Sequence, residues 1–296
     1  MKDFRLAAAA TISAMLALAS CAKARRDEFV VGSKNFTEQA ILGELIAQHL
    51  EAHTHLHVVR RFYLNGTYIC QQALLAGRID TYVEYTGTAL TAILKEPPIT
   101  DRAAAFERVH DGYAERFNLV VMPPLGFNNT FAIVVRGPDA RRLGIRTLSQ
   151  AVPFTPQWRA GFGYEFMERP DGYAGLAATY GLRFASPPRI MDLGLLYRAL
   201  LEKQVDIVAG NSTDGLLAAR DLSILEDDKH YFPPYEAVPI VRSRALEAHP
   251  EARAALLELA GKITDHEMQQ MNYAVDGQRR DAADVVREFL HGKGLD

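Results

Sequence analysis

The chain has 296 residues, of which 48% are hydrophobic and 23% are charged. This length suits two α/β domains or one large one, and the composition excludes a disordered chain. The formal net charge of −3 argues against the basic surface typical of nucleic-acid-binding proteins. The two cysteines, Cys21 and Cys70, exclude a disulfide framework and a cysteine-rich metal site.

The N-terminus reads as a targeting segment. Lys2 and Arg5 precede an uncharged run, residues 6–20, which is too short to span a bilayer as a helix and fits the apolar core of a signal peptide. The run ends in Leu-Ala-Ser before Cys21, which resembles the lipobox of bacterial lipoproteins. We therefore expect residues 1–20 to be removed, Cys21 to be lipidated and residues 21–28 to form a charged tether. Plain signal cleavage, with an incidental Cys21, is the alternative.

The first half of the chain alternates between strand and helix patterns. Asn35 is expected to cap a helix that runs to about Ala52, with Glu38 completing a capping box. Further helices are predicted over residues 66–77 and 103–117, and strands over residues 29–31, 56–63, 79–84, 119–122 and 131–135. This alternation predicts an α/β domain with a largely parallel sheet.

A second α/β unit follows. Helices are predicted over residues 175–180 and 193–202 and from residue 216, a strand over residues 205–209, and mostly helix over residues 245–290. The segment Phe232-Pro-Pro-Tyr235 is expected to be a rigid connector. The segment Gly161-Phe162-Gly163 is a weak dinucleotide-binding hint without a preceding strand or a third glycine, and we interpret it as a flexible loop.

One internal echo links the two units. The sequence ALLAGRID at residues 73–80 matches ALLEKQVD at residues 199–206, and both read as helix end, tight turn and strand. The echo places residues 85–88 and 211–214 at equivalent strand ends. Because ligands of open α/β sheets bind beyond the carboxyl ends of strands, two facing lobes would form a cleft between them.

Catalytic and metal motifs are weak. The chain has no Gly-x-Ser-x-Gly elbow, no His-Glu-x-x-His and no phosphate-binding Gly-x-x-x-x-Gly-Lys, so we expect no enzyme, cofactor or metal. His49, His53, His55 and His57 have spacings that can bind zinc, but a helix end and loop favour a solvated edge. Cys70 lies in an apolar helical stretch, which predicts a buried, inert thiol.

Aromatic residues fall near predicted strand ends and connectors. They are Tyr82, Tyr85, Phe131, Tyr197 and Tyr235, with polar neighbours at residues 86, 88 and 128–130. Any one of them alone is typical of a core, but together they would line a polar, aromatic cleft. Aromatic faces attract poorly hydrated cations, above all quaternary ammoniums, by about 0.5–2 kcal/mol per contact.

Five ordered motifs resemble one protein family. They are GSKNFTEQAILGE (32–44), YVEYTGTAL (82–90), LGFNNTFAIVVR (125–136), FMERPDG (166–172) and STDGLLAARDLSILEDDKHYFPPYEAVPIVR (212–242). Together they resemble the substrate-binding proteins of ABC importers for osmoprotectants such as glycine betaine, choline and carnitine. The resemblance covers nearly all of residues 29–296.

The resemblance implies a type II periplasmic-binding-protein fold with two hinged α/β lobes. We expect residues 29–130 and 237–296 to form lobe I and residues 131–236 to form lobe II, with the ligand between them. The resemblance also implies a monomer that delivers a quaternary amine to a membrane permease and its ATPase. With the N-terminal segment, it implies a lipoprotein at the periplasmic or extracytoplasmic face of a membrane.

The family's ligand residues map onto this chain by motif. A box of four tyrosines in relatives corresponds to Tyr85, Phe131, Asn211 and Tyr235, and contacts to the ligand's polar end correspond to Lys34 or Gln39, Thr88 and Arg169. Phe131 keeps an aromatic face without a hydroxyl, and Asn211 has no aromatic face. This departure fits either weak betaine binding or a site retuned for another betaine-like ligand, such as ergothioneine, which a related branch prefers.

Each polar position has an alternative role. Arg169 suits a ligand carboxylate through its planar fork, or an ion pair with Glu165 or Asp171. Lys34 and Gln39 are placed to bind an anion at the helix N-terminus, and the alternative is that they cap the helix or are solvated. Thr88 is placed to contact the ligand, and the alternative is that it caps a helix. A ligand-sensing module is the second functional hypothesis, disfavoured by the lack of a separate output domain.

Overall fold

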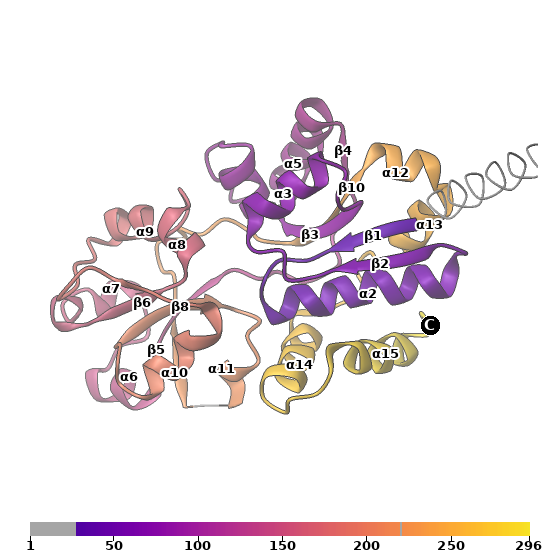
Figure 1. Cartoon of the computed structure of the whole chain (residues 1–296). Coiled ribbons are helices and arrows are strands. Elements are labelled where there is room, and N and C mark those ends of the chain that lie inside the picture. The colour runs from indigo at the N-terminus through magenta and orange to yellow at the C-terminus, as the bar shows by residue number, and fades with distance from the viewer. Residues whose placement is uncertain (1–27, 220) are drawn as a thin grey trace, which may run out of the picture.

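A computed structural model describes residues 28–219 and 221–296, so the targeting segment, Cys21 and the tether up to residue 27 lie outside the described residues. The described chain forms two sheets of five strands, each with helices on both faces (Figure 1). We call the part built on β1–β4 and β10 lobe I, and the part built on β5–β9 lobe II. No helix among the described residues is long and apolar enough to cross a membrane.

Lobe I is built on a sheet with the order β2-β1-β3-β10-β4. Its strands are β1 (Glu28–Gly32), β2 (His57–Arg61), β3 (Thr81–Tyr85), β4 (Leu119–Val121) and β10 (Ala237–Arg242). Its helices are α2 (Thr37–His53), α3 (Thr67–Leu75), α4 (Thr86–Thr88), the π-helical turn η1 (Ala89–Ile93), α5 (Arg102–Phe117), α12 (Ser243–Ala248), α13 (Pro250–Glu258), α14 (Asp265–Asp276) and α15 (Ala282–Lys293).

Lobe II is built on a sheet with the order β7-β6-β8-β5-β9. Its strands are β5 (Phe131–Arg136), β6 (Ala160–Phe162), β7 (Arg189–Ile190), β8 (Ile207–Asn211) and β9 (Leu222–Leu225). Its helices are α6 (Gly137–Leu143), α7 (Leu148–Ala151), η2 (Thr155–Gln157), α8 (Tyr164–Glu168), α9 (Tyr173–Tyr180), η3 (Leu193–Leu195), α10 (Leu196–Leu201) and α11 (Leu216–Ala219).

The chain crosses between the lobes twice, and each crossing leads into the antiparallel strand of a sheet. β5 is antiparallel to β8 and β9, and β10 is antiparallel to β3 and β4, whereas the other pairings are parallel. The two crossing segments pair with each other through an antiparallel bridge between Asn128 and Glu236, and Asn129 N–H donates to the Tyr235 carbonyl at 3.0 Å. This paired ribbon connects the two lobes.

The internal echo of the sequence has a structural counterpart. β3 ends at Tyr85 and β8 ends at Asn211, as the echo predicts. Asp80 before β3 pairs with Arg242 at the end of β10 (2.9 Å), and Asp206 before β8 pairs with Arg136 at the end of β5 (2.8 Å). In each lobe, an ion pair therefore connects the end of the antiparallel strand to the turn before the central parallel strand.

One local expectation is wrong, and one strand was not predicted. Residues 160–162 form the buried strand β6, paired with β7 and β8, so Gly161-Phe162-Gly163 is not a flexible loop. A Cβ at Gly161 would lie 2.9 Å from the Met191 side chain and 3.1 Å from that of Val205, so close packing explains the glycine. β10 was not predicted because Pro239 interrupts its apolar run, and proline lacks the N–H that a central strand normally uses.

Candidate functional site

A cavity of about 380 Å³ lies between the lobes, with walls from both sheets. Among its lining residues are seven of the eight positions that the sequence nominated, namely Lys34, Tyr85, Thr88, Phe131, Arg169, Asn211 and Tyr235. The eighth, Gln39, lies directly behind the wall, where its Nε2 donates to the Tyr85 hydroxyl at 3.1 Å. The structure thus brings the nominated residues together, and their role in binding a ligand stays a prediction.

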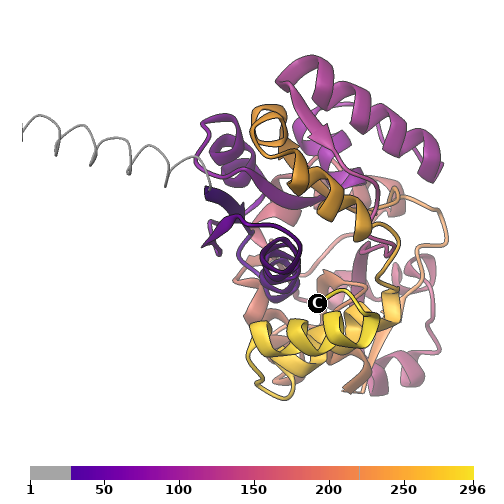
Figure 2. The same cartoon turned by 90° about the vertical axis from the view of Figure 1, so that its right-hand side faces the viewer.

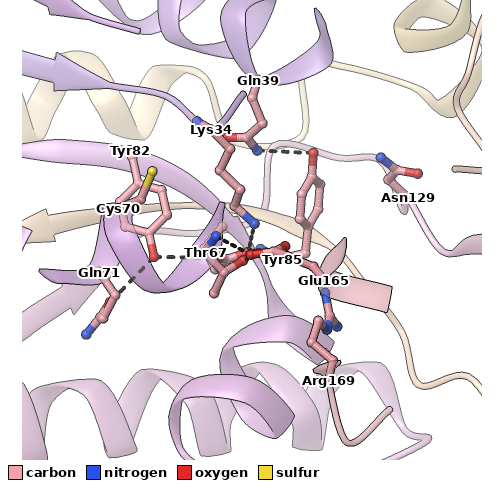
Figure 3. Close-up of polar contacts among 12 residues, drawn as sticks. Lys34, Gln39, Thr67, Cys70, Gln71, Tyr82, Tyr85, Asn129, Glu165 and Arg169 are labelled. Carbon is pink, nitrogen blue, oxygen red and sulfur yellow. Dashed lines mark hydrogen bonds and ion pairs between the residues drawn. The ribbon is translucent and has the colours of Figure 1, made fainter. Parts of the chain in front are cut away.

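Tyr85 is the aromatic wall contributed by lobe I. It ends β3, and its backbone leads straight into α4 and the π-helical turn η1, an irregular helix type that is frequent at functional sites. Its hydroxyl accepts from Gln39 (Figure 3). The same hydroxyl donates to Glu38 Oε1 at 2.6 Å, so the ring is held at one edge of the cavity. Lys34 Nζ lies 5.0 Å from the ring centroid.

Glu38 is buried and accepts several hydrogen bonds, and the capping role predicted for it is wrong. Helix α2 begins at Thr37 after Phe36, with no side-chain cap, so the predicted capping box of Asn35 and Glu38 does not form. The Glu38 carboxylate instead accepts hydrogen bonds from Tyr85, Asn129 (2.7 Å), Asn272 (2.9 Å) and Thr213. Burial raises the pKa of Glu38, while these donors favour its ionised form.

Lys34 is buried rather than solvated. Its ammonium pairs with Glu84, which is itself fully buried on β3, and only 2% of Lys34 is exposed. Gln39 is also buried, so surface solvation is excluded for both residues. Because Glu84 neutralises Lys34, the lysine adds little net positive charge to this wall.

Phe131 and Tyr235 form the opposite aromatic corner. Phe131 begins β5 of lobe II, Tyr235 lies in the crossing ribbon, and their ring centroids are 5.6 Å apart at 76°. The Arg169 guanidinium lies 5.0 Å from the Phe131 centroid and 5.7 Å from that of Tyr235. Tyr235 donates its hydroxyl to Asp171 Oδ2 at 2.6 Å, which fixes the ring.

Arg169 forms the ion pair that was one of its two alternatives, and its partner is Asp171. Nε donates to Asp171 Oδ1 at 2.9 Å, and Nη2 donates to Asp171 Oδ2. Burial opposes ionisation of Asp171, but the Arg169 charge outweighs it and holds the pKa of Asp171 below its usual range. The Nε–Nη2 edge of the guanidinium is therefore occupied by Asp171, whereas the Nη1 N–H groups and the second Nη2 N–H lie outside this ion pair.

Thr88 and Asn211 complete the predicted set. Thr88 is buried in α4 and lines the cavity, and its side chain caps no helix. Asn211 is the last residue of β8 and lines the cavity from lobe II. Tyr85 is the last residue of β3 and lines the cavity from lobe I. Tyr82 and Tyr197 do not line this cavity; Tyr82 is fully buried in the lobe I core, and Tyr197 donates to Asp214 at 2.5 Å.

Several hydrogen bonds join the two lobes, and two of them are next to the cavity residues. The Glu165 carboxylate of α8 accepts from the Thr67 N–H at the start of α3, and Thr213 of lobe II donates to Glu38 of lobe I. Glu165 is a wall residue that sequence reasoning considered only as a partner of Arg169. Nothing in its local sequence indicates the bridge, because Thr67 lies 98 residues earlier in the chain.

Asp214 is a buried carboxylate beside Asn211, and its burial is expected to make the stability of the protein depend on pH. Burial raises its pKa to about 6, although its carboxylate accepts from Tyr197 and from the Asn211 N–H at 2.8 Å. A raised pKa means that the folded state binds the proton more tightly, so this contribution to stability is complete below pH about 4 and is lost as the pH rises through 6.

We expect Asp214→Asn to remove this dependence. Between pH 4.5 and 7, the free energy of unfolding of the native chain should fall relative to that of the variant by on the order of 1–2 kcal/mol. Urea unfolding at both pH values measures the difference. Parallel pH profiles for the two proteins would contradict this role of Asp214.

The histidine cluster and Cys70 are not among the residues that line the cavity. His55 and His57 are exposed, and His53 is partly so, as expected of a solvated edge, but His49 is fully buried, which corrects that expectation. It packs on the inner face of α2 against the C-terminal end of the chain, where its Nδ1 lies 2.9 Å from the Leu295 carbonyl. Cys70 is buried, as predicted, and burial raises the pKa of its thiol to about 12, which disfavours the reactive thiolate.

Comparison with known proteins places these features in context. The family model described as the substrate-binding domain of ABC-type glycine betaine transport systems matches residues 27–292. The carnitine transport binding protein of Listeria monocytogenes is 34% identical over 288 residues, covering 94% of this chain and 92% of that protein.

Two further matches bear on the ligand. An ergothioneine transport permease and binding protein of Helicobacter pylori is 35% identical over 267 residues, covering 90% of this chain but only 48% of that protein. A crystal structure titled as a glycine betaine/carnitine/choline ABC transporter superposes with a TM-score of 0.75 at 33% identity, covering 90% of this chain and 99% of the other.

Proposed function

Because the chain belongs to the family of substrate-binding domains of ABC-type glycine betaine transport systems, we propose that it captures a quaternary-ammonium zwitterion in the cavity between its lobes. The protein is a substrate-binding protein of the ABC importer class. In our proposal it works at the extracytoplasmic face of a membrane, held by a lipid on Cys21, and hands its ligand to a permease with an ATPase beneath.

The observation that carries the proposal is the set of aromatic rings contributed from both sides of the cavity. Tyr85 comes from lobe I, Phe131 from lobe II and Tyr235 from the ribbon between them. Each tyrosine hydroxyl is anchored to a buried carboxylate, Glu38 for Tyr85 and Asp171 for Tyr235, so the rings are preorganised. Preorganised aromatic faces favour a methylated ammonium, whose weak hydration makes its transfer from water inexpensive.

Hydrogen-bond donors on the cavity walls, rather than net charge, are our basis for proposing a zwitterion. The two basic residues of the walls, Lys34 and Arg169, are each paired with a buried carboxylate. Arg169 Nη1 and the Thr88 hydroxyl remain donors for a ligand carboxylate in our proposal, while the rings take the ammonium end.

Binding is coupled to lobe closure in this proposal. The walls belong to different lobes, and the contacts Glu165–Thr67 and Glu38–Thr213 form only when the lobes face each other. A ligand that touches both walls binds the closed form more tightly and shifts the equilibrium toward it. The closed form is then the species that the permease recognises.

Isothermal titration calorimetry on the purified full chain tests the proposal. Glycine betaine, carnitine, choline and ergothioneine are titrated in turn, with glycine as the control that has the carboxylate but no methyl groups. We expect saturable binding of at least one trimethylammonium compound and none of glycine. Binding of glycine with equal affinity, or of none of the four, would contradict the proposed ligand class.

Asn211 is the position at which we expect this site to depart from a four-sided aromatic box. Asn211→Tyr adds an aromatic face beside Phe131, so we expect affinity for glycine betaine to rise by roughly threefold to tenfold, equivalent to about 0.6–1.4 kcal/mol. Asn211→Leu, which adds bulk without a π face, is the matched control. A loss of affinity in the tyrosine variant would instead indicate a ligand that hydrogen-bonds to Asn211, and ergothioneine is then the first compound to test.

A further inference from the structure

Three electron-pair donors converge at the end of α2 that lies away from the cleft. His49 and His53 are one helical turn apart, with ring centroids separated by 4.2 Å, and Glu258 at the end of α13 faces them. One ligand atom from each of the three residues lies within 4.8 Å of the other two. Gln39, behind the ligand cavity, is ten residues before His49 on the same helix, which corresponds to about 15 Å along its axis.

The main-chain carbonyl of Leu295 fixes the orientation of both histidine rings. It lies 2.9 Å from His49 Nδ1 and 3.2 Å from His53 Nε2. A carbonyl oxygen only accepts, so the protons of the neutral rings are on these two nitrogens. Figure 2 shows the C-terminal end of the chain beside α2, where this carbonyl lies.

The opposite nitrogens are therefore acceptors that face a third acceptor. His49 Nε2 lies 3.3 Å from Glu258 Oε2, and His53 Nδ1 lies 3.9 Å from the same oxygen. His49 Nε2 is buried and has no hydrogen-bond partner among residues 28–219 and 221–296. Lone pairs that face one another at this distance repel unless a proton or a metal ion lies between them.

A metal ion fits this arrangement, because it binds the lone pair of a neutral imidazole and the oxygen of a carboxylate at the same time. Two nitrogens and one carboxylate oxygen are ligands suited to zinc and similar ions rather than to magnesium or calcium, which prefer oxygen alone.

We propose that His49, His53 and Glu258 form a binding site for a divalent transition-metal ion such as Zn²⁺. With metal–ligand distances of about 2.0–2.2 Å, tetrahedral ligand atoms lie about 3.3–3.6 Å apart, close to the 3.3 and 3.9 Å separations here. The Leu295 carbonyl supplies the outer hydrogen bonds that metal-binding histidines normally make. Because 51% of the Glu258 side chain is exposed, this carboxylate can adjust its position toward the ion.

A metal ion bound at this site would connect three parts of lobe I. Glu258 belongs to α13, the histidines to α2, and Leu295 to the end of the chain, so the ion would join segments that the sequence separates widely. Its effect is expected on the stability of lobe I and not on the ligand cavity at the other end of α2.

Calorimetric titration of the untagged full chain with zinc chloride tests this proposal. We expect one zinc ion per chain, a higher melting temperature with zinc and a return to the original value with a chelator. Glu258→Gln and His53→Gln change partly exposed side chains, so both variants should fold, and each should weaken zinc binding at least tenfold. His57→Gln, which changes an exposed histidine outside the cluster, is the control and should leave it unchanged.

Three results would overturn the site. They are no saturable zinc binding, unchanged binding in both Glu258→Gln and His53→Gln, or an equal loss in His57→Gln. The affinity for the organic ligand should be the same with and without zinc, so this test is independent of the proposed transport function.

Discussion

Replacing Tyr85 or Tyr235 by leucine should weaken the binding of a trimethylammonium ligand by roughly tenfold or more for each ring. Leucine retains apolar bulk at positions that are only 5% and 2% exposed, but it has no π face. A desolvated cation–π contact contributes up to about 2 kcal/mol, and 1.4 kcal/mol corresponds to a factor of ten. Because the two rings lie on different walls, the double variant should lose on the order of a hundredfold.

Phenylalanine at each position separates the ring from its hydroxyl. Tyr85→Phe removes the donor to Glu38, and Tyr235→Phe removes the donor to Asp171, while both keep the aromatic face. We expect these variants to lose severalfold in affinity and less than the leucine variants. Titration calorimetry on folded protein, checked by circular dichroism, gives the comparison. Leucine variants that bind as tightly as the native chain would exclude an aromatic box.

Asp171→Ala should destabilise the protein by about 3–5 kcal/mol. The change leaves Arg169 charged and unpaired at a position where only 5% of the residue is exposed, and removing one member of a buried ion pair typically costs this much. It also removes the acceptor of the Tyr235 hydroxyl, so the wall loses its anchor. Urea unfolding at pH 7 measures the effect.

Two variants show whether burial is the cause. Glu202→Ala breaks the exposed pair with Arg198 and should cost less than about 0.5 kcal/mol, as expected for a solvated helix pair. The double variant Arg169→Met with Asp171→Leu removes both buried charges and should recover much of the lost stability. Equal effects of Asp171→Ala and Glu202→Ala would show that the buried pair is not an important element of lobe II.

The parts of this fold that follow from local pattern were predictable. Helix α2 shows its apolar face in the sequence, and the echo between residues 73–80 and 199–206 anticipates the equivalent ends of β3 and β8. β10 was not predicted, because Pro239 masks a central strand whose pairing partners lie far away in the chain. Strand pairing over such distances leaves no local signal.

The candidate site was predictable as a set of residues but not as a network. The motifs nominated Tyr85 and Arg169, yet the groups that hold them, Glu38 and Asp171, were assigned to capping or to one of two alternative ion pairs. The partners of Glu38 lie 47 to 234 residues away, so only the folded chain brings them together. The same holds for His49, whose burial depends on the final residues of the chain.

A crystal structure of the protein grown with glycine betaine tests the central claim most directly. We expect the trimethylammonium group between Tyr85, Phe131 and Tyr235, within about 6 Å of each ring centroid, and the carboxylate on the side of Arg169 and Thr88. A ligand elsewhere on the molecule, or a cavity that places the carboxylate against the three rings, would contradict it.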